Sequence, residues 1–370
     1  MSRQKHRRII ISGGGTGGHI FPAISIANAL RKIDPSAEIL FVGAEGRMEM
    51  EKVPSAGYEI VGLPVSGFNR KNLLKNISVI FRLLKSLSLA RRIIKEFKPD
   101  VVVGVGGYAS GPVLMMAGRS HIPFLILEQN SYAGIANKLL SKKAGTICVA
   151  YDGMEKYFPP EKIIKTGTPV RVSFDNLEDV RDEGYSYFGL QKGVPVILVL
   201  GGSLGAGTIN TSLSENLNEI INSGCQWIWQ TGKFYFEDVN ALVSVSSAGN
   251  IKVNEFVNRM DLAFSVADII ISRAGAGTIS ELCLVGKPVI LVPSPNVAED
   301  HQTKNAIALS EKNAAILVRD ELAVRSLIGE ALALVRDDAR RKSLSENIAR
   351  LAERDADMRI AREVLKLIKE

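Results

Sequence analysis

The sequence is poor in features that would place it in several common classes of protein. Its 370 residues include three cysteines, Cys148, Cys225 and Cys283, which are widely spaced and form no CxxC pair. This pattern argues against a disulfide scaffold or a cysteine zinc site and fits a reducing cytosol. The longest stretch without charge, residues 101–118, contains five glycines and a proline, so we interpret it as strand, loop and helix rather than as a membrane span. The basic N-terminus leads into a short β-rich run instead of an apolar signal core, and we expect no export signal.

The usual cofactor-binding fingerprints are also missing. Residues 9–23, IIISGGGTGGHIFPA, join a β-rich run to a glycine-rich loop and then to an apolar run. The loop has neither the spaced G-x-G-x-x-G of a dinucleotide site nor the Lys-Ser/Thr pair of a P-loop. A Rossmann oxidoreductase would also need an acidic residue at the end of its second strand, whereas EILFVGAEG reaches Glu45 only after a glycine turn. We therefore expect no nicotinamide or flavin cofactor.

A DxD pair, which holds a divalent ion on the diphosphate in metal-dependent transferases, occurs once. It is Asp355-Ala356-Asp357, in a charged C-terminal stretch with helical character. We interpret this pair as solvated surface and expect no metal site.

The chain does contain a repeated alternation of short apolar β-rich runs with helical stretches. Runs of this kind are typical of parallel sheets covered on both faces. They are RRIIIS, EILFVG, DVVVGVG, FLILEQ and TICVA in the first half, and VPVILVLGG, QWIWQTG, IKVNEF, DIIISRAG and PVILVPSP in the second. The pattern predicts an α/β fold with two Rossmann-like domains, residues 1–170 and 171–350, joined near a polar linker at residues 171–182. A last helix, about residues 351–370, is expected to pack back on the first domain.

Glycine-rich loops follow strands at three places, residues 13–18, 104–111 and 201–207. Glycine lets the backbone adopt positive φ and lets a ligand approach the amides, and the N-terminus of a following helix favours negative charge. Each loop alone is equally consistent with a tight structural turn. Three of them favour a shared ligand site, and the loop at residues 13–18 is a candidate cradle for a phosphate or a sugar.

Basic residues are concentrated between Gly67 and Lys98, where nine Lys and Arg accompany one acid, Glu96. Apolar residues recur there at helical spacing, namely Leu73, Leu74, Ile77, Phe81, Leu84 and Leu87, which predicts an amphipathic basic helix. Its basic face is either ordinary solvated surface or a docking surface for anionic lipid, with Phe68, Leu73, Leu74 and Ile77 as an apolar edge. A purely non-enzymatic membrane binder is disfavoured by the glycines and polar residues at strand ends. We expect no nucleic-acid partner.

Several motifs together carry a family resemblance. They are GGTGGHIFPA, GGYASGP, EQNSYAGIANK, GTPVR, GGSLGA, QTGK and SRAGAGTISEL…GKPVILVPSP…EDHQTKNA, in this order from Gly14 to about Ala306. The chain resembles the MurG family of bacterial glycosyltransferases. This resemblance implies a GT-B fold and inverting transfer of N-acetylglucosamine from UDP-N-acetylglucosamine to the muramoyl 4-hydroxyl of lipid I, an undecaprenyl-pyrophosphoryl pentapeptide, giving lipid II. It also implies peripheral attachment to the cytoplasmic face of the membrane and no cofactor.

Inverting transfer needs a base that deprotonates the acceptor hydroxyl. The chain has four histidines, His6, His19, His121 and His301, and His19 is the one that follows a glycine loop. By itself such a histidine could simply hydrogen-bond the start of a helix. The resemblance favours His19 as the catalytic base.

The resemblance also implies a set of substrate-binding residues. Glu281 is assigned to the ribose hydroxyls, Gln302 to the hydroxyls of the transferred sugar, and Arg171 to the hinge near the donor. The remaining members are Thr16, Gly17, Gly18 and Asn130 near the sugar and acceptor, Ser203 at the diphosphate, and Ala276, Gly277, Thr278, Ile279 and Ser280 at the donor. Thr168 and His301 depart from the residues that the family often has at these positions. Another GT-B glycolipid transferase or a UDP-sugar epimerase is the nearest alternative.

Overall fold

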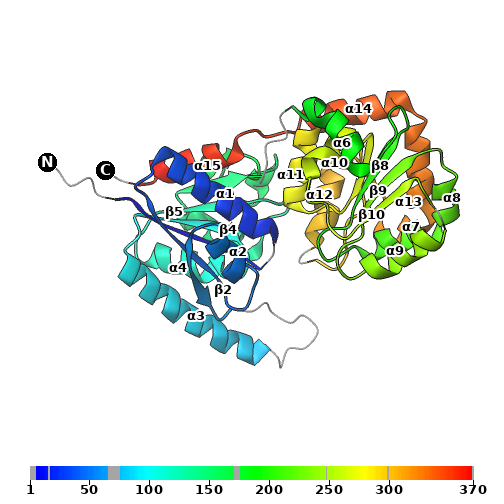
Figure 1. The fold of residues 1–370 in the computed structure, drawn as a ribbon. Helices are drawn as coiled ribbons and strands as arrows, with labels where there is room; N and C mark the ends of the chain where they lie inside the picture. Colours follow the sequence, from blue (N-terminus) through cyan, green and yellow to red (C-terminus); the bar gives the residue numbers. More distant parts are fainter. Residues whose placement is uncertain are drawn as a thin grey trace. The chain divides into compact units, whose positions relative to one another are not determined.

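The chain divides into two compact units, each built on its own parallel sheet (Figure 1). The structure, a computed structural model, describes residues 6–15, 17–65, 76–170, 176–246, 248–297 and 300–368. Unit 1 comprises residues 1–171 and 353–370, and unit 2 comprises residues 172–352. The candidate residues Thr16 and Arg171, the basic residues Arg70, Lys71 and Lys75, and the side chains of Phe68, Leu73, Leu74 and Ile77 lie outside the described part.

Unit 1 contains a seven-stranded parallel sheet in the order β3-β2-β1-β4-β5-β6-β7. Its strands are β1 (Arg8–Gly13), β2 (Glu38–Ala44), β3 (Glu59–Leu63), β4 (Val101–Gly106), β5 (Phe124–Glu128), β6 (Thr146–Val149) and β7 (Ile163–Lys165). Its helices are α1 (Gly17–Ile33), α2 (Glu49–Ser55), α3 (Asn76–Phe97), α4 (Ser110–Arg119), α5 (Ile135–Leu140) and α15 (Ala356–Lys366), with short 3-10 turns η2 (Ser141–Lys143), η3 (Met154–Lys156) and η4 (Pro160–Lys162).

The two faces of this sheet are covered by different helices because successive side chains of each strand point to opposite faces. Ile9 and Ile11 of β1 pack with α1 and α15, whereas Ile10 packs on the side of α3, α4 and α5. Figure 1 shows α15 lying beside α1, and Ile360 of α15 is fully buried there. Helix α15 therefore completes the core of unit 1, although the rest of that unit comes from the first 171 residues.

Unit 2 contains a six-stranded parallel sheet in the order β10-β9-β8-β11-β12-β13. Its strands are β8 (Val196–Leu200), β9 (Gln226–Gln230), β10 (Ile251–Asn254), β11 (Ile269–Ser272), β12 (Val289–Leu291) and β13 (Ile316–Leu317). Its helices are α6 (Arg181–Phe188), α7 (Gly207–Glu215), α8 (Leu217–Ile221), α9 (Phe236–Val245), α10 (Met260–Val266), α11 (Ala276–Val285), α12 (His301–Ser310), α13 (Asp320–Val335) and α14 (Asp338–Ala349), after the 3-10 turn η5 (Leu177–Val180).

The two sheets share one topology, because the first three strands of each run outward from the centre and the fourth returns to the other side of the first. This is the strand order of dinucleotide-type Rossmann folds, in which ligands bind at the carboxyl ends of the strands near the point of reversal. The predicted α/β fold with two Rossmann-like halves is confirmed. The three cysteines are buried and free.

Candidate active site

In unit 1, glycines bring two loops into direct contact at the carboxyl ends of the neighbouring strands β1 and β4. A Cβ on Gly107 would lie 2.1 Å from the carbonyl oxygen of Gly14, and Gly107 itself has φ of +82°. Side chains there would overlap with backbone, which cannot move away as a flexible side chain could. The glycine-rich loop after β1 is therefore fitted against the loop after β4.

His19 lies in the first turn of α1, directly after this loop, and is partly exposed. Its imidazole lies against Gly106, the last residue of β4. A Cβ on Gly106 would approach His19 Cδ2 to 2.6 Å and Nε2 to 2.8 Å, and Gly106 has φ of +102°. The position of the imidazole thus depends on a bare backbone at the end of the neighbouring strand.

Two buried glutamates also lie at this edge of the sheet, and neither was predicted as a site residue from the sequence. Glu49, in the first turn of α2, accepts hydrogen bonds from the backbone N–H groups of Gly15 and Ala44. Glu128 ends β5 and accepts from the N–H of Gly134, at 2.9 Å. A glutamate at the end of the apolar run FLILE is a visible signal for Glu128, because an acid at the carboxyl end of a buried parallel strand lies at the ligand edge of the sheet.

Glu128 organises the loop that carries Asn130. Its Oε1 accepts from the backbone N–H of Asn130 at 3.1 Å and from the Asn130 side-chain amide at 3.3 Å, and its Oε2 accepts from Asn137 Nδ2 at 2.8 Å. Burial raises the pKa of Glu128 above its ordinary value, while these N–H donors act in the opposite direction. Asn130 is consequently held in one orientation two residues beyond β5.

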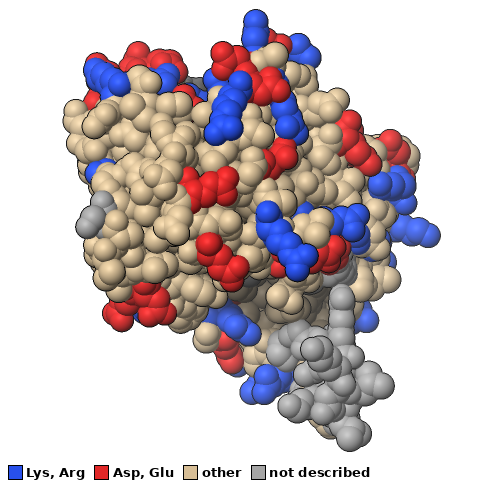
Figure 2. All heavy atoms as spheres, turned by 90° about the vertical axis from the view of Figure 1, so that its right-hand side faces the viewer, with Lys and Arg blue, Asp and Glu red and all other residues tan. Residues whose placement is uncertain are grey.

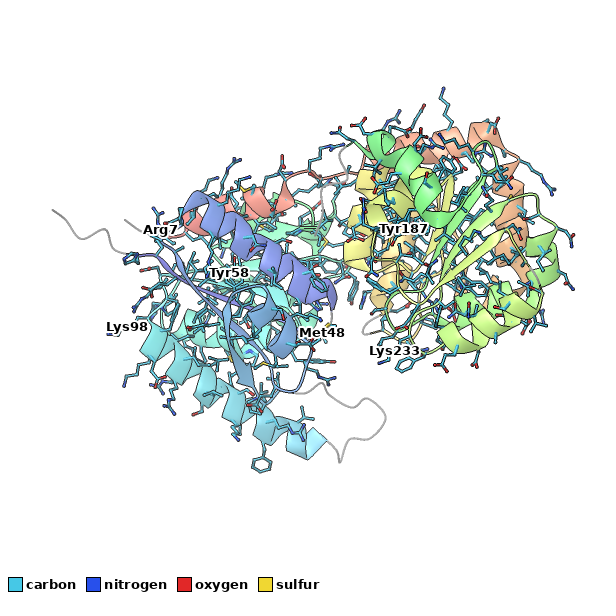
Figure 3. The ribbon with its side chains drawn as sticks, in the orientation of Figure 1. Arg7, Met48, Tyr58, Lys98, Tyr187 and Lys233 are labelled. Atoms are coloured by element: carbon cyan, nitrogen blue, oxygen red, sulfur yellow. The ribbon has the colours of Figure 1, made fainter. Side chains whose placement is uncertain are left out.

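In unit 2 the loop after β8, residues 201–207, is packed against the loop after β9. A Cβ on Gly232 would lie 2.1 Å from the backbone nitrogen of Gly205, and one on Gly205 would lie 2.4 Å from the ring of Tyr235. The N–H of Lys233, which is labelled in Figure 3, donates to the carbonyl oxygen of Ser203 at 3.1 Å. The Ser203 side chain is exposed at the tip of this loop, just before α7 begins.

The neighbouring strands β11 and β12 bring the other donor-site candidates to the same edge. Helix α11 begins at Ala276, four residues after β11, and Glu281 is partly buried in its second turn. Gln302, in the first turn of α12, accepts a hydrogen bond at its Oε1 from the N–H of Ser294, at 2.9 Å. Because β8, β11 and β12 are adjacent and parallel, the loop of Ser203, the start of α11 and Gln302 share one edge of the sheet.

Arg273 ties this edge together and was not identified from the sequence. Its guanidinium donates to Asp320 at the start of α13 and, at 2.9 Å, to the carbonyl oxygen of Val292 after β12. The other carboxylate oxygen of Asp320 accepts from Thr208 Oγ1 in the first turn of α7, at 2.8 Å. The starts of α7 and α13 and the segment after β11 are thereby linked through side chains.

No group of three or more His, Cys, Asp and Glu side chains in the described ranges is arranged to hold a metal ion. Among the helices as described, none combines the length and the apolar character needed to cross a bilayer.

Comparisons with known proteins identify the class to which the fold and these loops belong. The Glycosyltransferase family 28 N-terminal domain matches residues 9–149, and the Glycosyltransferase family 28 C-terminal domain matches residues 196–360. The chain is a family 28 glycosyltransferase with the GT-B fold. Crystal structures agree, since Acinetobacter baumannii MurG superposes with a TM-score of 0.75 at 27% identity, covering 97% of this chain and 99% of that one.

Curated relatives narrow the class to one family. A Phocaeicola vulgatus protein is 60% identical over 98% of this chain and 97% of its own length, and a Cytophaga hutchinsonii protein is 53% identical over 100% and 99%. Both are named UDP-N-acetylglucosamine--N-acetylmuramyl-(pentapeptide) pyrophosphoryl-undecaprenol N-acetylglucosamine transferase. This chain belongs to that family. A Neisseria meningitidis UDP-GlcNAc 2-epimerase superposes with a TM-score of 0.66 at 15% identity, which shows a shared fold alone.

Proposed function

We propose that this chain transfers N-acetylglucosamine from UDP-N-acetylglucosamine to the muramoyl 4-hydroxyl of lipid I, with inversion at the anomeric carbon, giving lipid II. The observation that carries the proposal is sequence identity of 57–60%, over 98% of this chain, with transferases of that name. In both sheets, polar side chains at the carboxyl ends of the strands offer the groups that substrate binding and proton transfer require. In this proposal unit 1 binds the acceptor and unit 2 binds the donor.

On the acceptor side, His19 accepts the proton of the attacking hydroxyl. The proposal is supported by its place in the first turn of α1 and by the fit of its ring against Gly106. A general base must reach the acceptor hydroxyl within hydrogen-bond distance. The loop Thr16, Gly17 and Gly18, together with Asn130, contacts the acceptor and the sugar, and the hydrogen bonds of Glu128 to Asn130 support a fixed side chain there.

On the donor side, the departing UDP needs stabilisation of its growing negative charge. We assign the diphosphate to the loop with Ser203, where α7 begins, because a helix N-terminus offers free N–H groups and a favourable dipole. Glu281 accepts hydrogen bonds from the ribose hydroxyls, and Gln302 contacts the transferred sugar. Arg171 and the start of α11, formed by Ala276, Gly277, Thr278, Ile279 and Ser280, complete the donor site.

The acceptor carries a polyprenyl chain, so the enzyme must work at a membrane surface, and we assign that contact to α3. Phe81 and Leu84, three residues apart on this helix, are 69% and 58% exposed. Exposed Arg82 and Lys85 lie beside them. Apolar side chains within a basic surface suit the interface of an anionic bilayer. In this proposal the protein attaches peripherally to the cytoplasmic face of the membrane.

The face of the molecule in Figure 2 differs from α3 in how its charged side chains are distributed. On the face shown in Figure 2, described Lys and Arg side chains lie among Asp and Glu side chains rather than in one field of a single sign. On α3, by contrast, the acid Glu96 is already paired with Arg92 at 2.7 Å. The concentration of basic charge on α3 supports its assignment as the membrane contact.

A transfer assay tests the proposed function directly. Purified protein is incubated with radiolabelled UDP-N-acetylglucosamine and a short-chain lipid I analogue, and label in the lipid product is measured. His19→Ala is expected to lower turnover by about 10²- to 10⁴-fold while UDP binding, measured by calorimetry, is retained. Conversion of the sugar nucleotide to its C2 epimer without acceptor, and no transfer with it, would favour the epimerase alternative.

A further inference from the structure

Glu49 is a buried acid that the proposed chemistry does not use. Its side chain is 1% exposed, in the first turn of α2, at the carboxyl end of β2. The neighbouring acid on the same helix, Glu51, is 74% exposed and pairs with Lys52. Burying a carboxylate is costly unless its oxygens receive hydrogen bonds, so the position of Glu49 requires specific partners.

Those partners are backbone N–H groups from two different loops. The N–H of Gly15 donates to both Oε1 and Oε2, at 3.0 Å each, and the N–H of Ala44 donates to Oε1 at 2.9 Å. Within the described residues no Lys, Arg or His forms an ion pair with Glu49. One carboxylate therefore joins the loop after β1 to the end of β2.

The space for this carboxylate exists because two residues lack a side chain. A Cβ on Gly14 would lie 2.0 Å from Glu49 Oε1, and one on Gly43 would lie 2.6 Å from Glu49 Cγ. Gly14 has φ of +152° and Gly15 has φ of +89°. The glycine-rich loop is thus shaped around the carboxylate, and the N–H of Gly15 is committed inside the protein rather than offered to a substrate anion.

The same short loop determines where His19 lies. Gly15 precedes the first residue of α1 by two positions, and His19 is the third residue of that helix. On its other side the loop meets the β4 end, where Gly107 lies against Gly14 and Gly106 lies against the imidazole. Glu49 and the β4 end therefore hold the loop from two directions.

We propose that Glu49 is a positioning residue for the acceptor-side base: its buried carboxylate fixes the loop that sets the orientation of His19. This inference rests on the proposed function of His19. Loss of the carboxylate frees the N–H groups of Gly15 and Ala44, and the loop then samples conformations in which the imidazole is misplaced. A misplacement of about 1 Å in a catalytic group costs on the order of 100-fold in rate.

Variants at position 49 separate charge and shape from simple stability. Glu49→Ala removes both acceptor oxygens and is expected to lower kcat about 100-fold. UDP affinity should be unchanged, because the donor residues on the loop of Ser203, α11 and α12 lie in unit 2. Glu49→Gln keeps the shape and one acceptor oxygen and is expected to retain intermediate activity, which also covers the case in which the alanine variant does not fold. Glu51→Ala and Glu51→Gln, on the same helix, are the matched controls and should keep wild-type turnover.

Two readouts distinguish positioning from a general structural role. In the His19→Ala background, Glu49→Gln should cause no further loss of turnover, since both changes act on the same step. Amide hydrogen exchange at Gly15 and Ala44, and the imidazole resonances of His19 by NMR, should change in Glu49→Gln and not in Glu51→Gln. Wild-type turnover in Glu49→Gln and Glu49→Ala, additive losses with His19→Ala, or unchanged exchange and resonances would each overturn the inference. If wild-type protein transferred no sugar, the proposed function would fail, while the NMR measurements would still decide whether Glu49 holds the loop.

Discussion

Replacing Gly106 by alanine tests the fit between β4 and His19. The new Cβ would lie 2.6 Å from the imidazole, and an ordinary van der Waals contact begins at 3.4 Å. The ring must therefore move by about 0.8 Å unless the backbone yields. From the rate cost of misplacing a catalytic group, we expect turnover to fall by about 100-fold.

Alanine at position 106 also costs stability, because φ of +102° is unfavourable for a residue with a side chain. Strain of this kind costs about 1–3 kcal/mol. Gly57 provides a matched control, since it has φ of +81° in the same unit and no atom within 4 Å of its Cβ position. Gly57→Ala should show a comparable decrease in Tm with normal turnover.

The assay combines label transfer to a short-chain lipid I analogue with thermal denaturation and UDP titration. Gly106→Ala should lose turnover, keep UDP affinity, and show little additional loss when combined with His19→Ala. Equal turnover in Gly106→Ala and wild-type protein would refute the reasoning, because the imidazole would then tolerate displacement. Equal losses in the two glycine variants would point to backbone strain instead of the contact with His19.

Three further predictions concern the donor, pH and the membrane. Glu281→Ala should weaken UDP binding by about 1–3 kcal/mol, measured by calorimetry, and turnover should survive chelator treatment; a strict requirement for added magnesium would contradict metal-independent transfer. Burial raises the pKa of Glu128 above 4.5 in the folded state, so its contribution to stability is complete below the unfolded pKa and is lost as pH rises through the folded pKa. The Tm of wild-type protein should therefore fall relative to Glu128→Gln as pH rises from about 4 toward neutrality, and parallel Tm curves would contradict this. Co-sedimentation with anionic vesicles should weaken with salt, since the screening length falls from about 10 Å at 0.1 M to about 3 Å at 1 M. It should also weaken in Phe81→Ser and Arg82→Ser but not in the control Val245→Ser, which alters an 87% exposed residue of unit 2. Equal binding to neutral and anionic vesicles would reject α3 as a basic membrane contact.

The strands predicted from sequence include every strand in the middle of each sheet and one edge strand, β10. The runs of the central strands, such as Ile9–Ile11 and Val101–Val103, are apolar without interruption because helices cover both faces. Strands β3, β7 and β13 were not predicted. Each ends a sheet or is only two or three residues long, and β7 and β13 are partly exposed throughout, so none has a distinctive apolar pattern.

The candidate site was predictable to the extent that its chemistry lies in local motifs. The glycine loops, His19 after the first of them, and Glu281 after SRAGAGTIS can be recognised because each motif occupies one stretch of chain. Arg273 and Asp320 are 47 residues apart, and their hydrogen bond has no local signature. Within the sequence Glu49 and Glu51 look alike, two acids in the first turn of one short helix.

The sequence by itself determined the kind of fold, most of its strands, and the family, since these depend on periodicity and on contiguous motifs. The tertiary structure alone decided which of two similar glutamates is buried, which glycine backbone lies against His19, and which helix the C-terminal segment meets. Those outcomes depend on contacts between residues distant along the chain, such as Glu49 with Gly15 and Gly106 with His19. The groups at the end of the neighbouring strand decide whether a buried carboxylate receives hydrogen bonds and whether only glycine fits beside a side chain.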